Sequence, residues 1–132
     1  SAAASDVYKR QEVILMKIYY ASRMGKVEKL AKMVSEEAIK IETADLEVNE
    51  DFVLFTYTDG HGIVPAIVEE FLKNTHAHLK GVVVSGSMER HADTYCFAGD
   101  IIAKEYNVPC LYKVDGAGTQ EDVAAIQELL SK

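Results

Sequence analysis

The chain has 132 residues, of which 48% are hydrophobic and 27% are charged, so it has enough apolar mass for one packed core. Its formal net charge of −7 argues against nucleic acid as a partner, because binding to phosphates needs a basic surface. No apolar run approaches the roughly 20 residues that span a bilayer, and the two cysteines are too few for a disulfide scaffold or a thiolate zinc site. Composition therefore predicts one globular domain in a reducing cytoplasm, without a membrane or nucleic-acid partner.

The N-terminal segment is treated separately from the rest. Residues 6–11 (DVYKRQ) resemble the product of a sequencing adaptor translated in one frame, and no signal-peptide core follows them. Residues 1–11 are accordingly interpreted as an adaptor-derived or disordered tail, and the folded domain is expected within residues 12–132. Met16 is a candidate natural start.

The first half of the remaining chain alternates strand and helix patterns. Residues 14–20 are mostly β-branched or aromatic, which is typical of a buried strand. From Lys26 the apolar residues fall on one helical face. These are Val27, Leu30, Ala31, Val34 and Ala38. Residues 39–43 predict a short strand, and residues 45–51 form an acidic connection.

The central part of the chain continues this alternation. Residues 52–57 (FVLFTY) form an apolar run of the kind that is buried on both faces of a parallel sheet, and residues 81–85 (GVVVS) predict another. Pro65 suits the first turn of the helix between them. Asp93 is a good N-cap for the next helix. That helix is expected to bury Phe97, Ala98, Ile101, Ile102 and Tyr106.

The last strand and helix complete the pattern. Residues 108–114 predict a strand, and Thr119 with Asp122 indicates a variant capping box that opens a final helix. That helix is expected to bury Val123, Ile126 and Leu130. The order β-α-β-β-α-β-α-β-α with right-handed crossovers predicts a three-layer α/β domain: a five-stranded parallel sheet of order 2-1-3-4-5 with helices on both faces, the flavodoxin-like arrangement.

Ligands in such sheets bind beyond the carboxyl ends of the strands, where three loops are expected to meet. Residues 21–26 supply the Ser22 hydroxyl, the flexible Gly25 and a helix N-terminus, which together suit a phosphate. Arg23 or Lys26 is a further candidate for gripping it. The alternative is an ordinary strand-to-helix turn, and the GxGxxG and P-loop motifs are absent from the sequence.

The second and third loops carry aromatic candidates. Tyr57 ends a strand beside the glycine-containing residues 58–62, where a planar aromatic ligand stacks well, although an ordinary turn is the commoner case. Tyr95 is a candidate second wall beside residues 86–93. Cys96 is expected to be structural, because the Cys-x5-Arg pattern of small phosphatases is not present.

Several stretches together resemble the NrdI family, over about residues 17–130. They include Ser22-x-x-Gly25-x-Val27 and Phe55-Thr56-Tyr57-Thr58, followed by Gly62-x-Val64-Pro65. The most diagnostic stretches are residues 98–103 (AGDIIA) and 108–113 (VPCLYK). Their order and spacing carry the resemblance, because no single stretch is specific.

The resemblance implies FMN as the cofactor, with its phosphate on residues 22–27 and its ring between residues 57–62 and 85–95. No metal ligand and no catalytic side chain are expected, since the chemistry lies on the flavin. The expected cofactor-binding residues are Ser22, Arg23, Met24, Gly25, Lys26, Val27, Tyr57, Thr58, Asp59, Gly60, His61, Gly62, Ser85, Gly86, Ser87, Met88, Asp93 and Tyr95.

The resemblance also implies a function. Proteins of this family reduce dioxygen to superoxide and supply it for assembly of the dimanganese-tyrosyl radical cofactor of the class Ib ribonucleotide reductase small subunit. The implied partners are that subunit, dioxygen and an unidentified electron donor. The chain is expected to be a monomer when alone. It is expected to act as a maturation partner rather than as a stand-alone enzyme. The alternatives are a general electron-transfer flavodoxin and a cofactor-free interaction module with the same fold.

Charged residues of both signs belong to the predicted loops. Negative charge near the ring disfavours a reduced, anionic flavin, and positive charge opposes this, so the balance depends on distances. The negative candidates are Asp59, Glu89 and Asp93. The positive candidates are Arg23, Lys26, Arg90 and His91.

Overall fold

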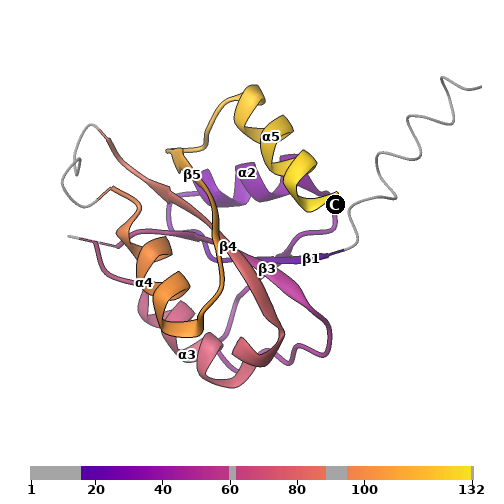
Figure 1. The fold of residues 1–132 in the computed structure, drawn as a ribbon, viewed down its shortest axis with the longest axis vertical. Helices are drawn as coiled ribbons and strands as arrows, with labels where there is room; N and C mark the ends of the chain where they lie inside the picture. Colours follow the sequence, from indigo (N-terminus) through magenta and orange to yellow (C-terminus); the bar gives the residue numbers. More distant parts are fainter. Residues whose placement is uncertain (1–15, 60–61, 89–94, 132) are drawn as a thin grey trace, which may run out of the picture.

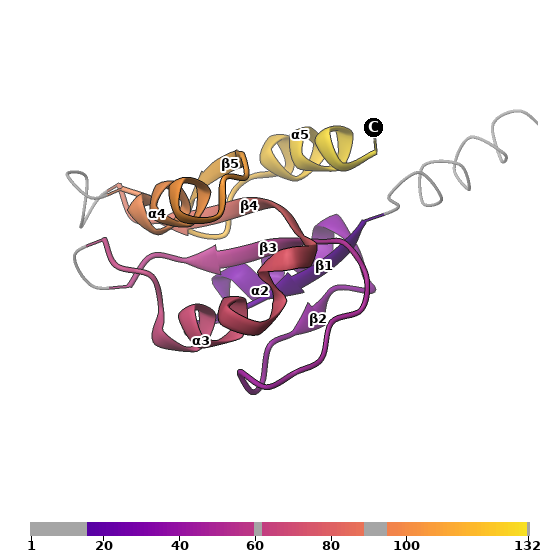
Figure 2. The same cartoon turned by 60° about the horizontal axis from the view of Figure 1, so that its bottom comes forward.

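The computed structural model describes residues 16–59, 62–88 and 95–131, and within these ranges five parallel strands form one sheet. The strands are β1 (Lys17–Tyr20), β2 (Ile39–Lys40), β3 (Phe52–Tyr57), β4 (Leu79–Gly86) and β5 (Cys110–Asp115). Their order is β2-β1-β3-β4-β5, which confirms the predicted topology. Figure 2 views the sheet with β2 near one edge and β5 at the other.

Helices cover both faces of the sheet, so the three-layer prediction is also confirmed (Figure 1). The helices are α2 (Lys26–Val34), α3 (Ala66–Thr75), α4 (Phe97–Tyr106) and α5 (Gln120–Leu130), with a short 3-10 helix η1 (His76–His78) after α3. One apolar cluster lies between the sheet and α2 and α5, and the other lies under α3 and α4. No helix in the described part of the chain is long and apolar enough to cross a membrane.

The central position of β3 in the sheet explains why its sequence is almost wholly apolar. Successive side chains of a strand point to opposite faces, so Phe52 and Leu54 enter the cluster under α3 and α4. Val53 and Phe55 enter the cluster under α2 and α5. All four side chains are buried, as expected for a strand that is covered on both faces.

Some ends of elements differ from the prediction. Strand β1 begins at Lys17, and β5 runs over Cys110–Asp115 rather than residues 108–114. Helix α2 ends at Val34, because Ser35 adopts an extended conformation with φ −151° and ψ 125°. Ala38 is nevertheless buried, since the turn that follows α2 returns it to the core.

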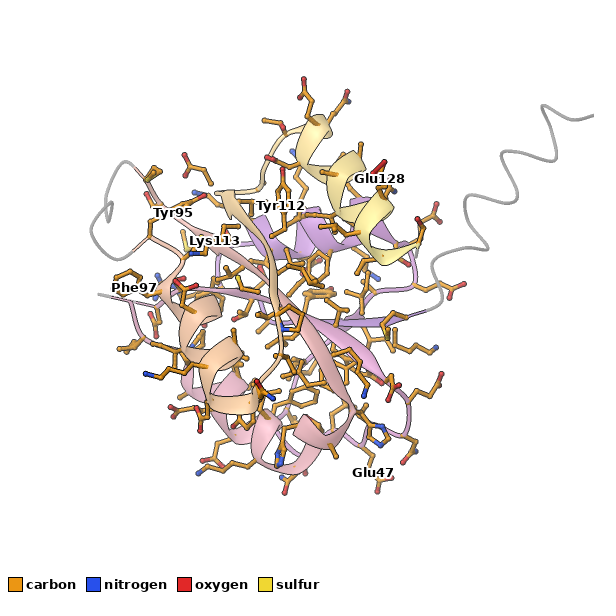
Figure 3. The ribbon with its side chains drawn as sticks, in the orientation of Figure 1. Glu47, Tyr95, Phe97, Tyr112, Lys113 and Glu128 are labelled. Carbon is orange, nitrogen blue, oxygen red and sulfur yellow. The ribbon has the colours of Figure 1, made fainter. Side chains whose placement is uncertain are left out.

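The buried face of α4 also differs from the prediction. Phe97 and Ile101 are 43% and 41% exposed, so the prediction that they are buried is wrong. Ala98 and Ile102 face the core instead. The reason lies at Gly99, where an added Cβ would stand 2.5 Å from a methyl group of Val84, so this close approach fixes which face of α4 meets the sheet. Figure 3 shows Phe97 at the outer surface of the molecule.

The start of α4 differs from the prediction, because its N-cap is Cys96 and not Asp93. Asp93, the predicted N-cap, lies outside the described residues. The helix begins at Phe97, and Cys96 occupies the N-cap position with a left-handed backbone of φ 58°.

The predicted capping box of α5 is confirmed. The Asp122 N–H donates to the Thr119 hydroxyl at 3.2 Å, and the Thr119 N–H donates to the Asp122 carboxylate at 2.8 Å. The predicted inward residues Val123, Ile126 and Leu130 are all buried. The Tyr112 hydroxyl of β5 donates to the same Asp122 carboxylate at 2.7 Å, which fixes α5 against the sheet edge (Figure 3).

Candidate functional site

The described parts of four loops lie at the carboxyl ends of the strands, which point to the left in Figure 1. We call residues 21–26 the first loop, residues 58–62 the second loop and residues 86–93 the third loop. Sequence analysis predicted these three. The fourth loop, residues 115–119 between β5 and α5, was not predicted.

The first loop forms an open cradle at the start of α2. The Gly25 N–H donates to the Ser22 hydroxyl at 3.1 Å, and Gly25 has φ +88°, a conformation that favours glycine. An added Cβ at Gly25 would meet no atom of the described residues within 4 Å. No side chain in the described ranges caps α2, so its first-turn N–H groups remain available to an anion.

The side chains of the first loop point in different directions. Val27 is buried in the core, so only its backbone faces the loop, whereas Met24 is 77% exposed. The Lys26 side chain runs toward the fourth loop, with its Cδ atom 3.8 Å from an added Cβ at Gly116. These residues therefore offer backbone donors and one lysine cation.

Arg23 bridges the first and second loops. Its Nη1 atom lies 3.1 Å from Oδ1 of Asp59, and its guanidinium carbon lies 5.6 Å from the centre of the Tyr57 ring. The second distance is within the range of a cation–π contact. The guanidinium is thus engaged by the second loop.

The second loop holds the aromatic candidate and a hydroxyl without a partner. Tyr57 is partly buried and packs against both core clusters. Burial raises the pKa of Tyr57, Asp59 raises it further and Arg23 opposes them. The Thr58 N–H donates to the Ser85 carbonyl at 3.0 Å, which joins the second loop to the end of β4.

The Thr58 hydroxyl oxygen is buried, and among the described residues it has no hydrogen-bond partner. A buried hydroxyl without a partner is costly, so Thr58 is a candidate contact for a ligand. Asp59 and Ile63 then close the loop by an isolated antiparallel bridge.

Hydrogen bonds within the described residues join the end of β4 and the start of the third loop to the fourth loop. The Ser85 hydroxyl donates to the Gly116 carbonyl at 2.6 Å, and the Gly116 N–H donates to the Gly86 carbonyl at 2.9 Å. The Met88 N–H donates to the Asp115 carboxylate at 3.2 Å. The fourth loop therefore supports the start of the third. The position of the fourth loop was predictable from the strand order, because the last strand was predicted to lie beside the strand that ends at Ser85.

Tyr95 and Cys96 pack against the end of β4. An added Cβ at Gly86 would stand 2.8 Å from the Cys96 nitrogen and 3.2 Å from a ring carbon of Tyr95, so this position needs glycine. Burial raises the pKa of Tyr95. Figure 3 shows Tyr95 at the site edge, while Glu47 and Glu128 lie far from it.

Cys96 does not provide a nucleophile. It is buried, its thiol lies 3.5 Å from the Val84 carbonyl and 3.6 Å from the Val114 carbonyl, and burial raises its pKa to about 11. The thiol is therefore protonated at neutral pH, which fits the structural role expected for it.

Most of the predicted residues lie at this edge of the sheet. Gly62 has φ +98° in the second loop, and Met88 is 51% exposed in the third. Ser87 directly precedes Met88. Gly60, His61 and Asp93 lie outside the described residues, so their predicted roles stay predictions.

The assembled edge suits a planar aromatic molecule that carries a phosphate. The start of α2 provides N–H donors for the phosphate, and Tyr57 provides a ring at the neighbouring strand end. The buried hydroxyl of Thr58, the residue after Tyr57, is a further polar group without a partner among the described residues. This donor set fits a flavin mononucleotide.

Comparison with known proteins gives one consistent result. A family model described as "NrdI Flavodoxin like" matches residues 18–128. Protein NrdI of Ruegeria sp. (strain TM1040) is 37% identical over 123 residues, covering 87% of each chain. The SPbeta prophage-derived protein NrdI of Bacillus subtilis (strain 168) is 34% identical over 111 residues, covering 81% of this chain and 84% of its own.

A mycobacterial relative extends the match. Protein NrdI of Mycobacterium tuberculosis (strain ATCC 25618 / H37Rv) is 31% identical over 128 residues, covering 87% of this chain and 85% of its own. The family-model match contains every described strand and helix from β1 to α5, except Lys17 at the start of β1 and the last two residues of α5. The chain therefore belongs to the NrdI family of flavodoxin-like proteins.

Proposed function

We propose that this protein binds FMN at the carboxyl edge of its sheet and serves class Ib ribonucleotide reductase by reducing dioxygen to superoxide. The superoxide is the oxidant for assembly of the dimanganese-tyrosyl radical cofactor in the reductase small subunit. The observation that carries the proposal is the family match over residues 18–128, which implies a flavin cofactor and an association with ribonucleotide reductase. The geometry of the four loops supports FMN as that flavin.

The residues of the first loop are proposed to hold the phosphate. The uncapped first turn of α2 supplies N–H donors and the positive end of the helix dipole. Gly25 adopts the left-handed conformation of this turn, and no described atom lies within 4 Å of the position of an added Cβ. Lys26 adds a cation at the start of the same helix.

The second and third loops are proposed to hold the ring. Tyr57 offers an aromatic surface, and the Thr58 hydroxyl offers a hydrogen bond that no described residue takes. The fourth loop holds the third in place through Asp115 and Gly116. When bound, FMN supplies the electron transfer to dioxygen, and the protein contributes binding, orientation and local charge.

The partner is proposed to dock at the exposed edge of this site, because the oxidant leaves there. Glu89, Arg90 and His91 of the third loop are the candidate contacts, and they lie outside the described residues. Substituting each of them should weaken the complex with the small subunit without releasing FMN. If all three substitutions leave complex formation unchanged, the docking face lies elsewhere. The electron donor is unidentified, and we expect a monomer in the cytoplasm.

The decisive experiment is an anaerobic reductive titration of the FMN-reconstituted protein, followed by aeration with a superoxide-specific probe. The proposal expects a bound flavin spectrum, complete reduction and superoxide release on aeration. A chain that takes up no FMN would instead be a cofactor-free interaction module. A bound flavin whose reduced form resists dioxygen would indicate a general electron-transfer flavodoxin.

The small-subunit step needs its own measurement. The manganese-loaded small subunit should gain a tyrosyl radical, read by electron paramagnetic resonance, only when the reduced protein and dioxygen are both present. A protein heated to unfold it and release its FMN provides the control for superoxide formed by free flavin. Equal radical yield with free FMN alone would contradict the proposal.

A further inference from the structure

The described part of the site carries charges of both signs, and two of them form a contact between loops. Arg23 of the first loop and Asp59 of the second are 36 positions apart in the chain and lie 3.1 Å apart, Nη1 to Oδ1. Lys26 lies along the fourth loop, and Asp115 accepts a hydrogen bond from the Met88 N–H. Among the described residues, the Arg23–Asp59 pair lies beside Tyr57.

The Arg23–Asp59 pair is open to water. The two side chains are 61% and 33% exposed, so the pair contributes little to stability. Its main physical effect is on the local potential. The guanidinium also lies 5.6 Å from the centre of the Tyr57 ring, so both charges act at the position where the proposed ligand ring meets the protein.

We infer that the Arg23–Asp59 pair balances charge at this site, so that each ion cancels most of the other's effect on a flavin bound beside Tyr57. The inference rests on the proposed function, because it concerns how strongly the protein prefers oxidised over reduced FMN. Two opposite charges 3.1 Å apart act at a distance as a dipole, whose field falls off faster than that of a single charge. Removing one partner converts this dipole into a net charge.

The two single substitutions therefore have opposite effects. Reduction adds negative charge to a flavin. Arg23→Met leaves the Asp59 carboxylate unbalanced and weakens binding of reduced FMN relative to oxidised FMN. Asp59→Asn leaves the Arg23 guanidinium unbalanced and strengthens binding of reduced FMN relative to oxidised FMN. The double variant removes both charges and restores the balance.

The flavin-free protein offers a separate readout in the Tyr57 hydroxyl. Asp59 raises the pKa of Tyr57 and Arg23 lowers it, in addition to the larger effect of burial. Asp59→Asn should therefore lower this pKa, and Arg23→Met should raise it. Titration by NMR with carbon-13-labelled tyrosine measures both changes, and the Tyr57→Phe variant identifies the resonance.

The binding test compares dissociation constants for oxidised and reduced FMN under anaerobic conditions. The ratio of the two constants should change at least threefold in opposite directions in the two single variants and stay within twofold of wild type in the double variant. The matched control is the exposed Lys73–Glu70 pair on α3, whose atoms lie 3.0 Å apart. Lys73→Met and Glu70→Gln should leave the ratio unchanged.

The possible outcomes separate this inference from the proposed function. If wild type binds no FMN, the proposed function fails and this inference fails with it. If FMN binds but neither single variant changes the ratio, or both change it in the same direction, only the inference is overturned. If Arg23→Met weakens both redox states equally, Arg23 holds the phosphate and does not balance charge at the ring, which also overturns the inference.

Discussion

At the scale of single residues, the site is defined by positions where the protein alone leaves something unsatisfied or open. Thr58 buries a hydroxyl that takes no hydrogen bond within the described residues, and Gly25 keeps an open cradle before α2. Neither feature improves the packing of the protein alone. The Thr58 hydroxyl is the feature that a bound ligand would satisfy, whereas the φ of +88° at Gly25 itself favours glycine.

Thr58→Val separates stability from binding. Valine has nearly the shape of threonine without the hydroxyl, so the substitution removes a buried polar atom that lacks a partner. The free energy of unfolding of the flavin-free protein should stay unchanged or rise. FMN affinity should fall by about fivefold to tenfold, the loss expected for one hydrogen bond.

Urea denaturation and fluorescence titration with FMN measure the two effects of Thr58→Val. Thr56→Val is the control, because the Thr56 hydroxyl is satisfied by the Tyr57 carbonyl at 3.0 Å. That variant should lose stability. If Thr58→Val instead destabilises the flavin-free protein and leaves FMN affinity unchanged, the hydroxyl serves the fold.

Gly86→Ala tests the close packing at the end of β4. The added Cβ would stand 2.8 Å from the Cys96 backbone nitrogen, which cannot move without displacing the start of α4. We expect a loss of about 1–3 kcal/mol in the free energy of unfolding, as for other overpacked sites. Gly81→Ala is the control, because its nearest contacts are side-chain atoms, Cδ1 and Cγ of Leu111 at 2.7 and 2.9 Å, and a side chain can rotate away more easily than a backbone atom can move. Equal losses in the two variants would contradict this explanation.

At the scale of elements, continuous apolar runs predicted the central strands and helical spacing predicted the helices, but spacing alone did not choose the buried face of α4. Phe97 and Ile101 lie four positions apart, as do Ala98 and Ile102, so both pairs satisfy the same pattern. The close contact of Gly99 with Val84 decides between them, and this contact depends on the fold rather than on the local sequence. The ends of β1 and β5 were misplaced for a similar reason, because a strand ends where its partner's hydrogen bonds end.

Helix α5 supplies a prediction on pH. Hydrogen bonds from the Tyr112 hydroxyl and from Thr119 lower the pKa of Asp122. A carboxylate whose pKa is lowered by folding stabilises the protein fully above its unfolded-state pKa, near pH 4, and this contribution is lost as the pH falls through the folded-state pKa. Asp122→Asn should therefore lower stability at pH 6 and have a smaller effect near pH 2.

Urea midpoints measured from pH 2 to pH 6 check this expectation for α5. Glu121→Gln is the matched control, since Glu121 is the neighbouring acidic residue and its side chain is not part of the capping box. Its effect should vary little over the same range. A difference between wild type and Asp122→Asn that is constant with pH would show that the carboxylate charge is not what stabilises the helix start.

At the scale of the whole molecule, the strand order was predictable and most of the site followed from it. In an order of 2-1-3-4-5, the first, third and fourth strands end side by side, which places the first, second and third loops together. The Arg23–Asp59 contact could not be predicted, because it depends on the directions of two side chains from separate loops. The position of the fourth loop was predictable from the same strand order, because β5 pairs with β4 and Gly86 lies opposite Asp115.

Because the loops of the site come from β1, β3, β4 and β5, bound FMN should stabilise the entire domain. A ligand that binds only the folded state adds RT ln(1 + [L]/Kd), or about 2.7 kcal/mol at 100 times Kd. Urea denaturation at increasing FMN concentration should follow this relation with one cooperative transition. A variant that begins at Met16 should show the same increase, because the described strands and helices all lie within residues 17–130. If saturating FMN leaves the unfolding free energy unchanged, this linkage is contradicted. If the chain that begins at Met16 shows no increase in the unfolding free energy with FMN, the N-terminal segment belongs to the site.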